Sequence, residues 1–239
     1  MLLPYLLDLS VTFAFLAWGS ASDVRRRAVN SFLFLPVAIA GLAYGAYVHE
    51  PLFFLVLSGI SFILAFVRTD ILLYPALAAS MLGVSTYFVT IEPTYGLQLL
   101  LISIVLLAGY REVVFGIGDI KAMVSAMISL SALLPLTPVM VQEGQLLSIV
   151  PSAIMLVINA GLSSILFFPY LAIRNAVRGG QFDFAWFLTV PDGEDPRKFS
   201  ERDLSGRRLR IYKVPFIVPI LIGSIATALF GAWPVLLVR

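Results

Sequence analysis

The chain has 239 residues, of which 60% are hydrophobic and only 13% are charged, and its mean hydropathy is +0.97. A soluble domain carries about 25% charged residues, so this chain cannot solvate its own surface and lipid must be the missing solvent. With no Cys and a single His, the sequence excludes disulfides, thiolate catalysis and Cys- or His-rich metal sites. Asp and Glu are the only plentiful catalytic side chains that remain.

Apolar segments of membrane length divide the chain. In chain order they are residues 4–22, 31–48, 52–67, 71–90, 96–111, 120–140, 146–170 and 214–236. An untilted span needs about 20 residues, and the third and fifth segments are short. The sequence therefore predicts an all-α polytopic membrane protein, a bundle of 6–8 transmembrane helices. The first segment has no basic start and runs into an Arg cluster, so we expect a retained span, not a cleaved signal peptide.

The basic residues are confined to alternate loops. All 16 Lys and Arg residues except Arg239 lie in these loops or at the adjacent helix ends. The loops concerned are 23–30, 68–70, 112–119 and 171–213. The positive-inside rule makes this side cytoplasmic. It also accounts for the net charge of +2, so we expect membrane lipid and no nucleic acid as a partner.

The long polar stretch predicts the domain organisation. Residues 1–173 form a helical bundle that carries both candidate catalytic aspartates, and 214–239 form a C-terminal transmembrane helix. Between them, 174–213 are too few for an independent domain with a large core. Several aromatic residues give this stretch something to bury, so we expect a small cytoplasmic subdomain before the last helix.

Two aspartates lie where chemistry at a membrane face needs them. Asp23 ends the first apolar segment and Asp119 precedes the sixth, so the even number of spans between them brings both to the cytoplasmic face. Paired carboxylates share a proton, because neighbouring like charges do not both ionise readily. The ionised member can activate water while the protonated member donates to the developing oxyanion. The pair therefore suits peptide hydrolysis without a metal or other cofactor.

Glycines flank the second aspartate. Gly116 and Gly118 lie on either side of one apolar residue just before Asp119. Glycine permits unusual backbone angles and the close approach of another chain, so a substrate strand could reach the carboxylate. The alternative for Asp119 alone is helix N-capping, which Asp also favours.

Other polar residues near the pair could serve either the reaction or only the membrane insertion of the chain. Lys121 would either tune a carboxylate pKa and hold substrate, or snorkel to the interface. Arg25 and Arg27 would either contact substrate, or set topology and bind anionic lipid. We expect no metal ligands.

Three polar features lie away from the pair. Asp8, near the external end of the first segment, is expected to snorkel or cap, and His49 with Glu50 to be an ordinary loop pair. Asn159, inside the seventh segment, is expected to make an interhelical hydrogen bond.

Residues 116–121, Gly-Ile-Gly-Asp-Ile-Lys, resemble the GxGDxK signature of type IV prepilin peptidases and archaeal preflagellin peptidases, the GxGD membrane aspartic proteases. Residues 23–29, Asp-Val-Arg-Arg-Arg-Ala-Val, are similar to the first-aspartate segment of that family. Residues 214–223 resemble the closing helix of its archaeal branch. The resemblance implies that Asp23 and Asp119 are the catalytic pair.

The same resemblance implies the substrate. The family removes class III signal peptides from preflagellin or prepilin-like precursors at the cytoplasmic face of the cell membrane. Bacterial relatives often carry a tetracysteine zinc domain and a methyltransferase activity, and without Cys we expect neither here.

Two other functions stay open. A small transporter or channel could use the two aspartates as a proton relay, since acids within a polytopic protein often serve ion pathways. A protease that cuts inside the membrane helix of its substrate would use the same chemistry at a different scissile bond.

Overall fold

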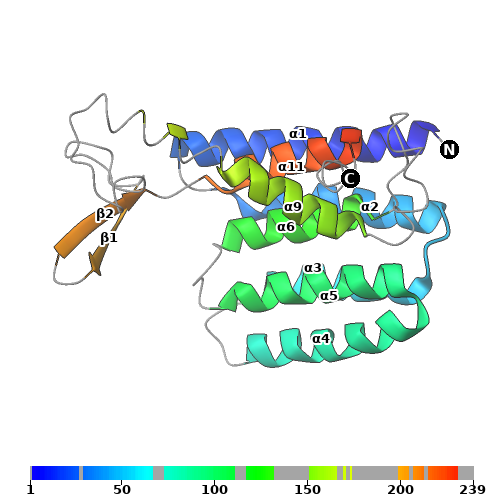
Figure 1. The fold of residues 1–239 in the computed structure, drawn as a ribbon. Helices are drawn as coiled ribbons and strands as arrows, with labels where there is room; N and C mark the ends of the chain where they lie inside the picture. Colours follow the sequence, from blue (N-terminus) through cyan, green and yellow to red (C-terminus); the bar gives the residue numbers. More distant parts are fainter. Residues whose placement is uncertain are drawn as a thin grey trace, which may run out of the picture.

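The computed structural model describes residues 2–26, 29–66, 73–110, 117–131, 151–165, 169–170, 173, 199–204, 207–212 and 215–230. These residues form mainly helices (Figure 1). The helices are α1 (Leu2–Arg26), the 3-10 helix η1 (Ser31–Phe34), α2 (Leu35–Tyr47), α3 (Leu52–Leu64), α4 (Leu73–Ile91), α5 (Pro93–Ala108), α6 (Ile117–Ser129), α9 (Ser152–Ile165) and α11 (Ile217–Phe230).

The helical prediction is confirmed for the described residues. Each of the eight predicted apolar segments contains an α-helix among its described residues, with η1 opening the second segment. By length and composition, two of these helices can cross a membrane, Leu3–Arg26 and Leu73–Ile91. Within the same residues the other apolar helices are shorter, at 10–17 residues.

An antiparallel hairpin is the one β element among the described residues. β1 (Phe199–Leu204) pairs with β2 (Arg207–Tyr212), with Phe199 opposite Tyr212. The hairpin falls inside the range 174–213 that the sequence assigns to a cytoplasmic subdomain, for which no strand was predicted. The aromatic residues expected to support that subdomain lie outside the described residues.

The helices lie side by side in a layered bundle. Figure 1 shows α1 and α11 along one side, α4 on the other, and α6, α3 and α5 between them, with the hairpin beyond one end. The neighbours include α1 with α2 and α11, α2 with α6, α9 with α11, and α5 with α3 and α4. Helices consecutive in the chain, such as α4 and α5, therefore pack together, and so do helices far apart in sequence, such as α1 and α11.

Helices α1 and α6 run antiparallel. The Ser129 hydroxyl at the end of α6 lies 2.5 Å from the Thr12 hydroxyl and 3.0 Å from Oδ2 of Asp8, both in the first half of α1. The 3-10 helix η1 also packs against α6, and its Phe34 ring lies beside Gly19 in the second half of α1. From Ser129 the rest of α6 thus runs toward the second half of α1, so the end of α1 and the start of α6 point toward the same end of the bundle. We call it the aspartate end, and the other the Glu50 end.

The bundle buries polar groups and exposes apolar ones. Many large apolar side chains face outward, such as Leu3 at 72% and Leu52 at 76% exposure. Hydroxyl and amide side chains lie inside, and several serines donate to the carbonyl four residues earlier in their own helix. Such bonds satisfy a hydroxyl without water.

Other buried polar groups link neighbouring helices. The Gln98 amide donates to the Met127 carbonyl at 2.9 Å, which joins α5 to α6. The Asn159 amide donates to the Thr227 hydroxyl at 3.0 Å, which confirms the expected interhelical bond. These bonds fix the register between packed helices.

Glycine permits two close helix crossings. A Cβ added to Gly41 of α2 would lie 2.5 Å from the Cα of Ser129 in α6. A Cβ on Gly223 of α11 would lie 2.6 Å from the backbone nitrogen of Ala160 in α9. Small residues at such contacts let helix backbones approach and gain dispersion contacts.

Candidate functional site

Asp23 lies in the last turn of α1 and is half-buried, and its Oδ2 atom is fully covered. The neighbouring Arg25 is exposed, as a residue that contacts lipid head groups or solvent would be. Arg27 lies outside the described residues. The structure thus separates the inward aspartate from the outward arginine that follows it.

Asp119 lies in the first turn of α6 and is also half-buried. Because α6 begins at Ile117, Asp119 is the third residue of the helix and does not occupy the N-cap position. A carboxylate in the first turn is still stabilised by the exposed backbone N–H groups of the helix start. The position therefore suits an ionised Asp119 but does not require it for capping.

The two aspartates reach the same level of the bundle. Counting from the contact between Thr12 and Ser129, Asp23 lies eleven residues further along α1, or about 16 Å at 1.5 Å per residue. Asp119 lies ten residues back along α6, or about 15 Å. Because the helices are antiparallel, both distances run toward the aspartate end, so the aspartates share one depth there.

Open space borders the second aspartate. Gly118 lies inside α6, and a Cβ added to it would meet no heavy atom of the described residues within 4 Å. Its backbone φ is not positive, so the unusual backbone angle expected from the sequence is not seen at Gly118. Gly116 lies outside the described residues. The described side chains therefore leave the backbone of Gly118 uncovered next to Asp119.

Lys121 is held inside the bundle. Its side chain is 6% exposed, and its Nζ lies 4.1 Å from the ring centroid of Phe66, just beyond α3. Residues two apart on a helix point in different directions, so Lys121 and Asp119 do not share a face of α6. The alternative expectation, that Lys121 snorkels to the interface, is therefore wrong. A role of Lys121 toward substrate or a carboxylate pKa stays a prediction.

An apolar pocket lies beside this lysine. It has a volume of about 210 Å³ and is lined by Phe32, Leu35, Phe62, Ile63 and Phe66 from η1, α2 and the end of α3. Phe66 lines the pocket and also contacts Lys121, which follows Asp119 in the first half of α6. The pocket therefore lies at the aspartate end.

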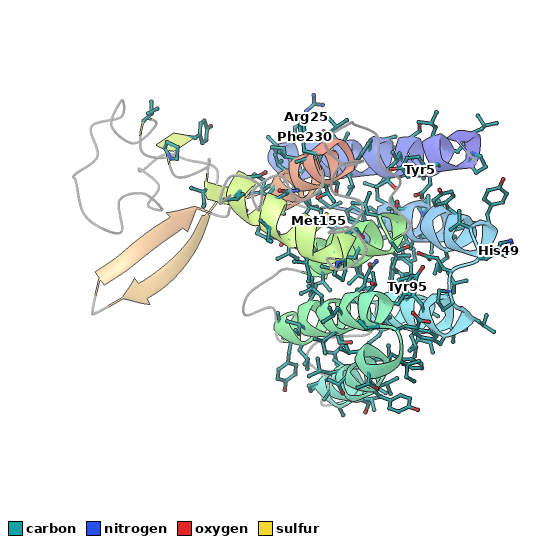
Figure 2. The ribbon with its side chains drawn as sticks, turned by 45° about the vertical axis from the view of Figure 1, so that its right-hand side comes forward. Tyr5, Arg25, His49, Tyr95, Met155 and Phe230 are labelled. Atoms are coloured by element: carbon teal, nitrogen blue, oxygen red, sulfur yellow. The ribbon has the colours of Figure 1, made fainter. Side chains whose placement is uncertain are left out.

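A second pair of acids lies at the Glu50 end, and sequence reasoning missed it. Asp8 is only 2% exposed and accepts hydrogen bonds from Ser129, so the expectation that it snorkels or caps is wrong. Glu50 is 7% exposed and accepts from Ser131 at 3.1 Å, so it is no ordinary loop residue. Figure 2 labels His49 beside it at this end of the bundle.

Burial dominates the electrostatics of Glu50. Desolvation raises its pKa to about 7, the hydrogen bond from Ser131 lowers it, and the nearby charge of Asp8 raises it further. In the sequence, Glu50 follows Gly45 by five residues at the end of a predicted helix. That pattern is too weak to predict that the carboxylate is buried.

Comparison with protein-family models, curated proteins and solved structures finds no match. Among the described residues, no group of three or more His, Cys, Asp or Glu side chains is placed to hold a metal ion. The function must therefore be argued from the chain's own residues.

Proposed function

We propose that the chain is a multi-pass membrane aspartic endopeptidase. It removes class III signal peptides from preflagellin or prepilin-like precursors at the cytoplasmic face, by water activation between Asp23 and Asp119. The observation that supports this most is the common depth of the two aspartates, on antiparallel helices at one end of the bundle. The resemblance of residues 23–29 and 116–121 to the GxGD peptidases supplies the substrate class.

The distribution of polar residues supports a membrane bundle. Large apolar side chains cover much of the outside, while Gln98, Asn159 and several serines are buried and hydrogen-bonded. Water would favour the reverse arrangement, whereas hydrocarbon requires each polar group to find an internal partner. The confinement of Lys and Arg to alternate loops supports a cytoplasmic aspartate end, by the positive-inside rule.

The proposed chemistry needs the pair to hold one proton. The ionised aspartate removes a proton from water as the water oxygen attacks the scissile carbonyl carbon. The protonated aspartate donates to the carbonyl oxygen, which develops negative charge. Collapse of the tetrahedral diol breaks the C–N bond as the first aspartate returns its proton to the leaving amine and the second aspartate takes a proton back from a diol hydroxyl.

A cleavage assay tests the proposal. Membranes that contain the protein are mixed with a preflagellin or prepilin that carries its basic signal peptide. We expect the precursor to shorten at the junction before its hydrophobic helix, as read by mass spectrometry of the new N-terminus. If the wild-type protein cleaves no such precursor, the substrate class is wrong. A new N-terminus inside the hydrophobic helix would instead support a protease that cuts within the membrane.

Gly118→Ala separates substrate approach from folding. The added methyl group meets no atom in the part of the chain that the structure describes, so we expect the unfolding temperature to stay the same or rise slightly, since Ala favours helix over Gly by about 1 kcal/mol. The methyl group projects into the space beside Asp119, so we expect precursor cleavage to fall at least tenfold.

Gly161→Ala in α9 is the matched control. Its added methyl group also meets nothing within 4 Å, and it lies on a different helix from both aspartates. Equal cleavage by Gly118→Ala and Gly161→Ala would show that substrate does not pass over Gly118.

The transporter alternative gains one observation. Asp8 and Glu50 are buried at the end opposite Asp23 and Asp119, so acids lie at both ends of the bundle, as a proton relay would need. Proton flux into liposomes that contain the purified protein would distinguish the two functions. Flux that is abolished by Asp23→Asn, without any precursor cleavage by the wild type, would favour transport.

A further inference from the structure

The backbone turn at the C-terminal end of α2 directs Glu50 into the bundle. The N–H of Glu50 donates to the Gly45 carbonyl at 2.9 Å, and the N–H of His49 donates to the Ala46 carbonyl at 3.3 Å. This is the Schellman pattern, which places a residue in the left-handed region after the helix. His49 holds that place with a φ of 63°, although glycine is the usual occupant. A strained backbone at a non-glycine residue often marks a functional site.

Gly45 makes room for the inward carboxylate. A Cβ added at Gly45 would collide with Oε2 of Glu50, so the carboxylate packs directly on the bare helix backbone. The same Oε2 accepts a hydrogen bond from Ser131 at 3.1 Å. Glu50 is therefore fixed by its backbone turn, by Gly45 and by Ser131.

Asp8 approaches from the other side. Both of its oxygens accept from the Ser129 hydroxyl, at 3.0 and 3.1 Å, and that hydroxyl also contacts Thr12. Glu50 lies close enough for the charge of Asp8 to act on it. Two carboxylates and three hydroxyl groups thus gather between α1, the end of α2 and the end of α6.

Two buried oxygen atoms of this group lack a hydrogen-bond partner among the described residues. In the part of the chain that the structure describes, Oε1 of Glu50 and the Tyr44 hydroxyl are covered and have no hydrogen-bond partner. Tyr44 is 4% exposed, and the charges of Asp8 and Glu50 both act on its phenol. Unsatisfied buried oxygens are costly, so such atoms point to a missing partner.

A cavity reaches the group from the side of the bundle. It has a volume of about 260 Å³ and lies between α1 and α2. Asp8 and Tyr44 are its polar lining residues, and Pro4, Leu7, Val11 and Tyr47 contribute apolar walls. Within the described residues, no Lys or Arg side chain bonds to either carboxylate, although a buried charge requires a counter-charge.

We propose that Asp8 and Glu50, with the hydroxyl groups around them, bind a hard metal cation, either calcium or sodium. Carboxylates and hydroxyls supply the oxygen ligands that such cations prefer. The ion supplies the missing positive charge and a partner for the left-over oxygens of Glu50 and Tyr44. It ties α1, α2 and α6 together at the Glu50 end. This site is independent of the proposed protease site.

Thermal unfolding of the purified full-length protein in detergent tests the site. Calcium chloride and sodium chloride are compared with choline chloride at equal ionic strength. The measurement is made at about pH 8, above the pKa of about 7 of Glu50, because protons compete less with cations there. We expect one of the two metal salts to raise the unfolding temperature of the wild type by several degrees over choline. Which salt acts identifies the ion.

Two isosteric variants and one control locate the effect. We expect Asp8→Asn and Glu50→Gln to lose the cation-dependent rise, and Glu92→Gln, an exposed acid at the same end, to keep it. Where a variant does not fold, binding of radioactive calcium and sodium to the wild type decides, with one ion per chain expected.

Three results would overturn the proposal. The first is no saturable binding of either ion to the wild type. The second is an equal salt effect in Glu50→Gln and the wild type. The third is stabilisation by acid alone without any response to either metal salt, which would mean that protons occupy the pair.

Discussion

Asp23→Asn and Asp119→Asn should each reduce precursor cleavage at least about a hundredfold, because positioned acid–base catalysis contributes 10²- to 10⁴-fold. The amide keeps the shape of the carboxyl group but can neither remove a proton from water nor share one with its partner. Both aspartates are half-buried at one depth of the aspartate end, so both substitutions strike the same step. Rates of appearance of the mature precursor, in membranes with equal amounts of protein, give the measurement.

The double variant sharpens this result. Residues that act as one unit lose activity non-additively, so Asp23→Asn with Asp119→Asn should be scarcely slower than either single variant. Glu92→Gln, which removes an exposed carboxylate at the opposite end, should cleave at the wild-type rate. Full activity in either single aspartate variant, with correct membrane insertion, would refute the catalytic pair.

Unchanged folding must accompany the lost activity. Asn keeps the shape of the Asp side chain, and both aspartates are half-buried at helix ends, so we expect both variants to unfold within about 1 kcal/mol of the wild type. A large fall in stability would mean that the aspartates serve packing and not chemistry.

The sequence was most informative about the apolar segments. Long apolar segments predict helices directly, because hydrocarbon requires each backbone polar group to bond within its own segment. All eight segments contain an α-helix among the described residues, and the even number of segments between Asp23 and Asp119 already predicts that they lie at one end of the bundle. Asn159 was also predictable, since an amide in an apolar helix must find a partner on a neighbour.

The sequence failed where a side chain's direction depends on tertiary contacts. Lys121 was expected to be able to reach the interface, but Phe66 offers its ring inside the bundle. In the sequence, Glu50 follows a loop residue, which predicts a side chain exposed to solvent. Its burial depends on the left-handed His49, on the missing side chain of Gly45 and on Ser131, which lies 81 residues away in sequence. No local pattern reports contacts of that kind.

Gly41→Val should produce the largest loss of stability. The first added carbon would lie 2.5 Å from the Cα of Ser129 and 2.7 Å from its backbone nitrogen, where no flexible side chain can yield. Helices α2 and α6 must therefore move apart, and overpacking of this kind costs about 1–3 kcal/mol. At about 2–4 °C per kcal/mol for a chain of this size, the unfolding temperature in detergent should fall by several degrees.

Activity should fall with it, because the same crossing sets the position of α6. Ser129 holds α6 against Thr12 and Asp8 of α1, and that contact fixes the common depth of Asp23 and Asp119. Gly83→Ala in α4 is the control, since its added methyl group meets nothing within 4 Å and should leave both stability and cleavage intact. If Gly41→Val unfolded at the wild-type temperature, the close contact between α2 and α6 would not exist in the protein. If it lost stability but cleaved at the full rate, the depth of Asp119 would not depend on that crossing.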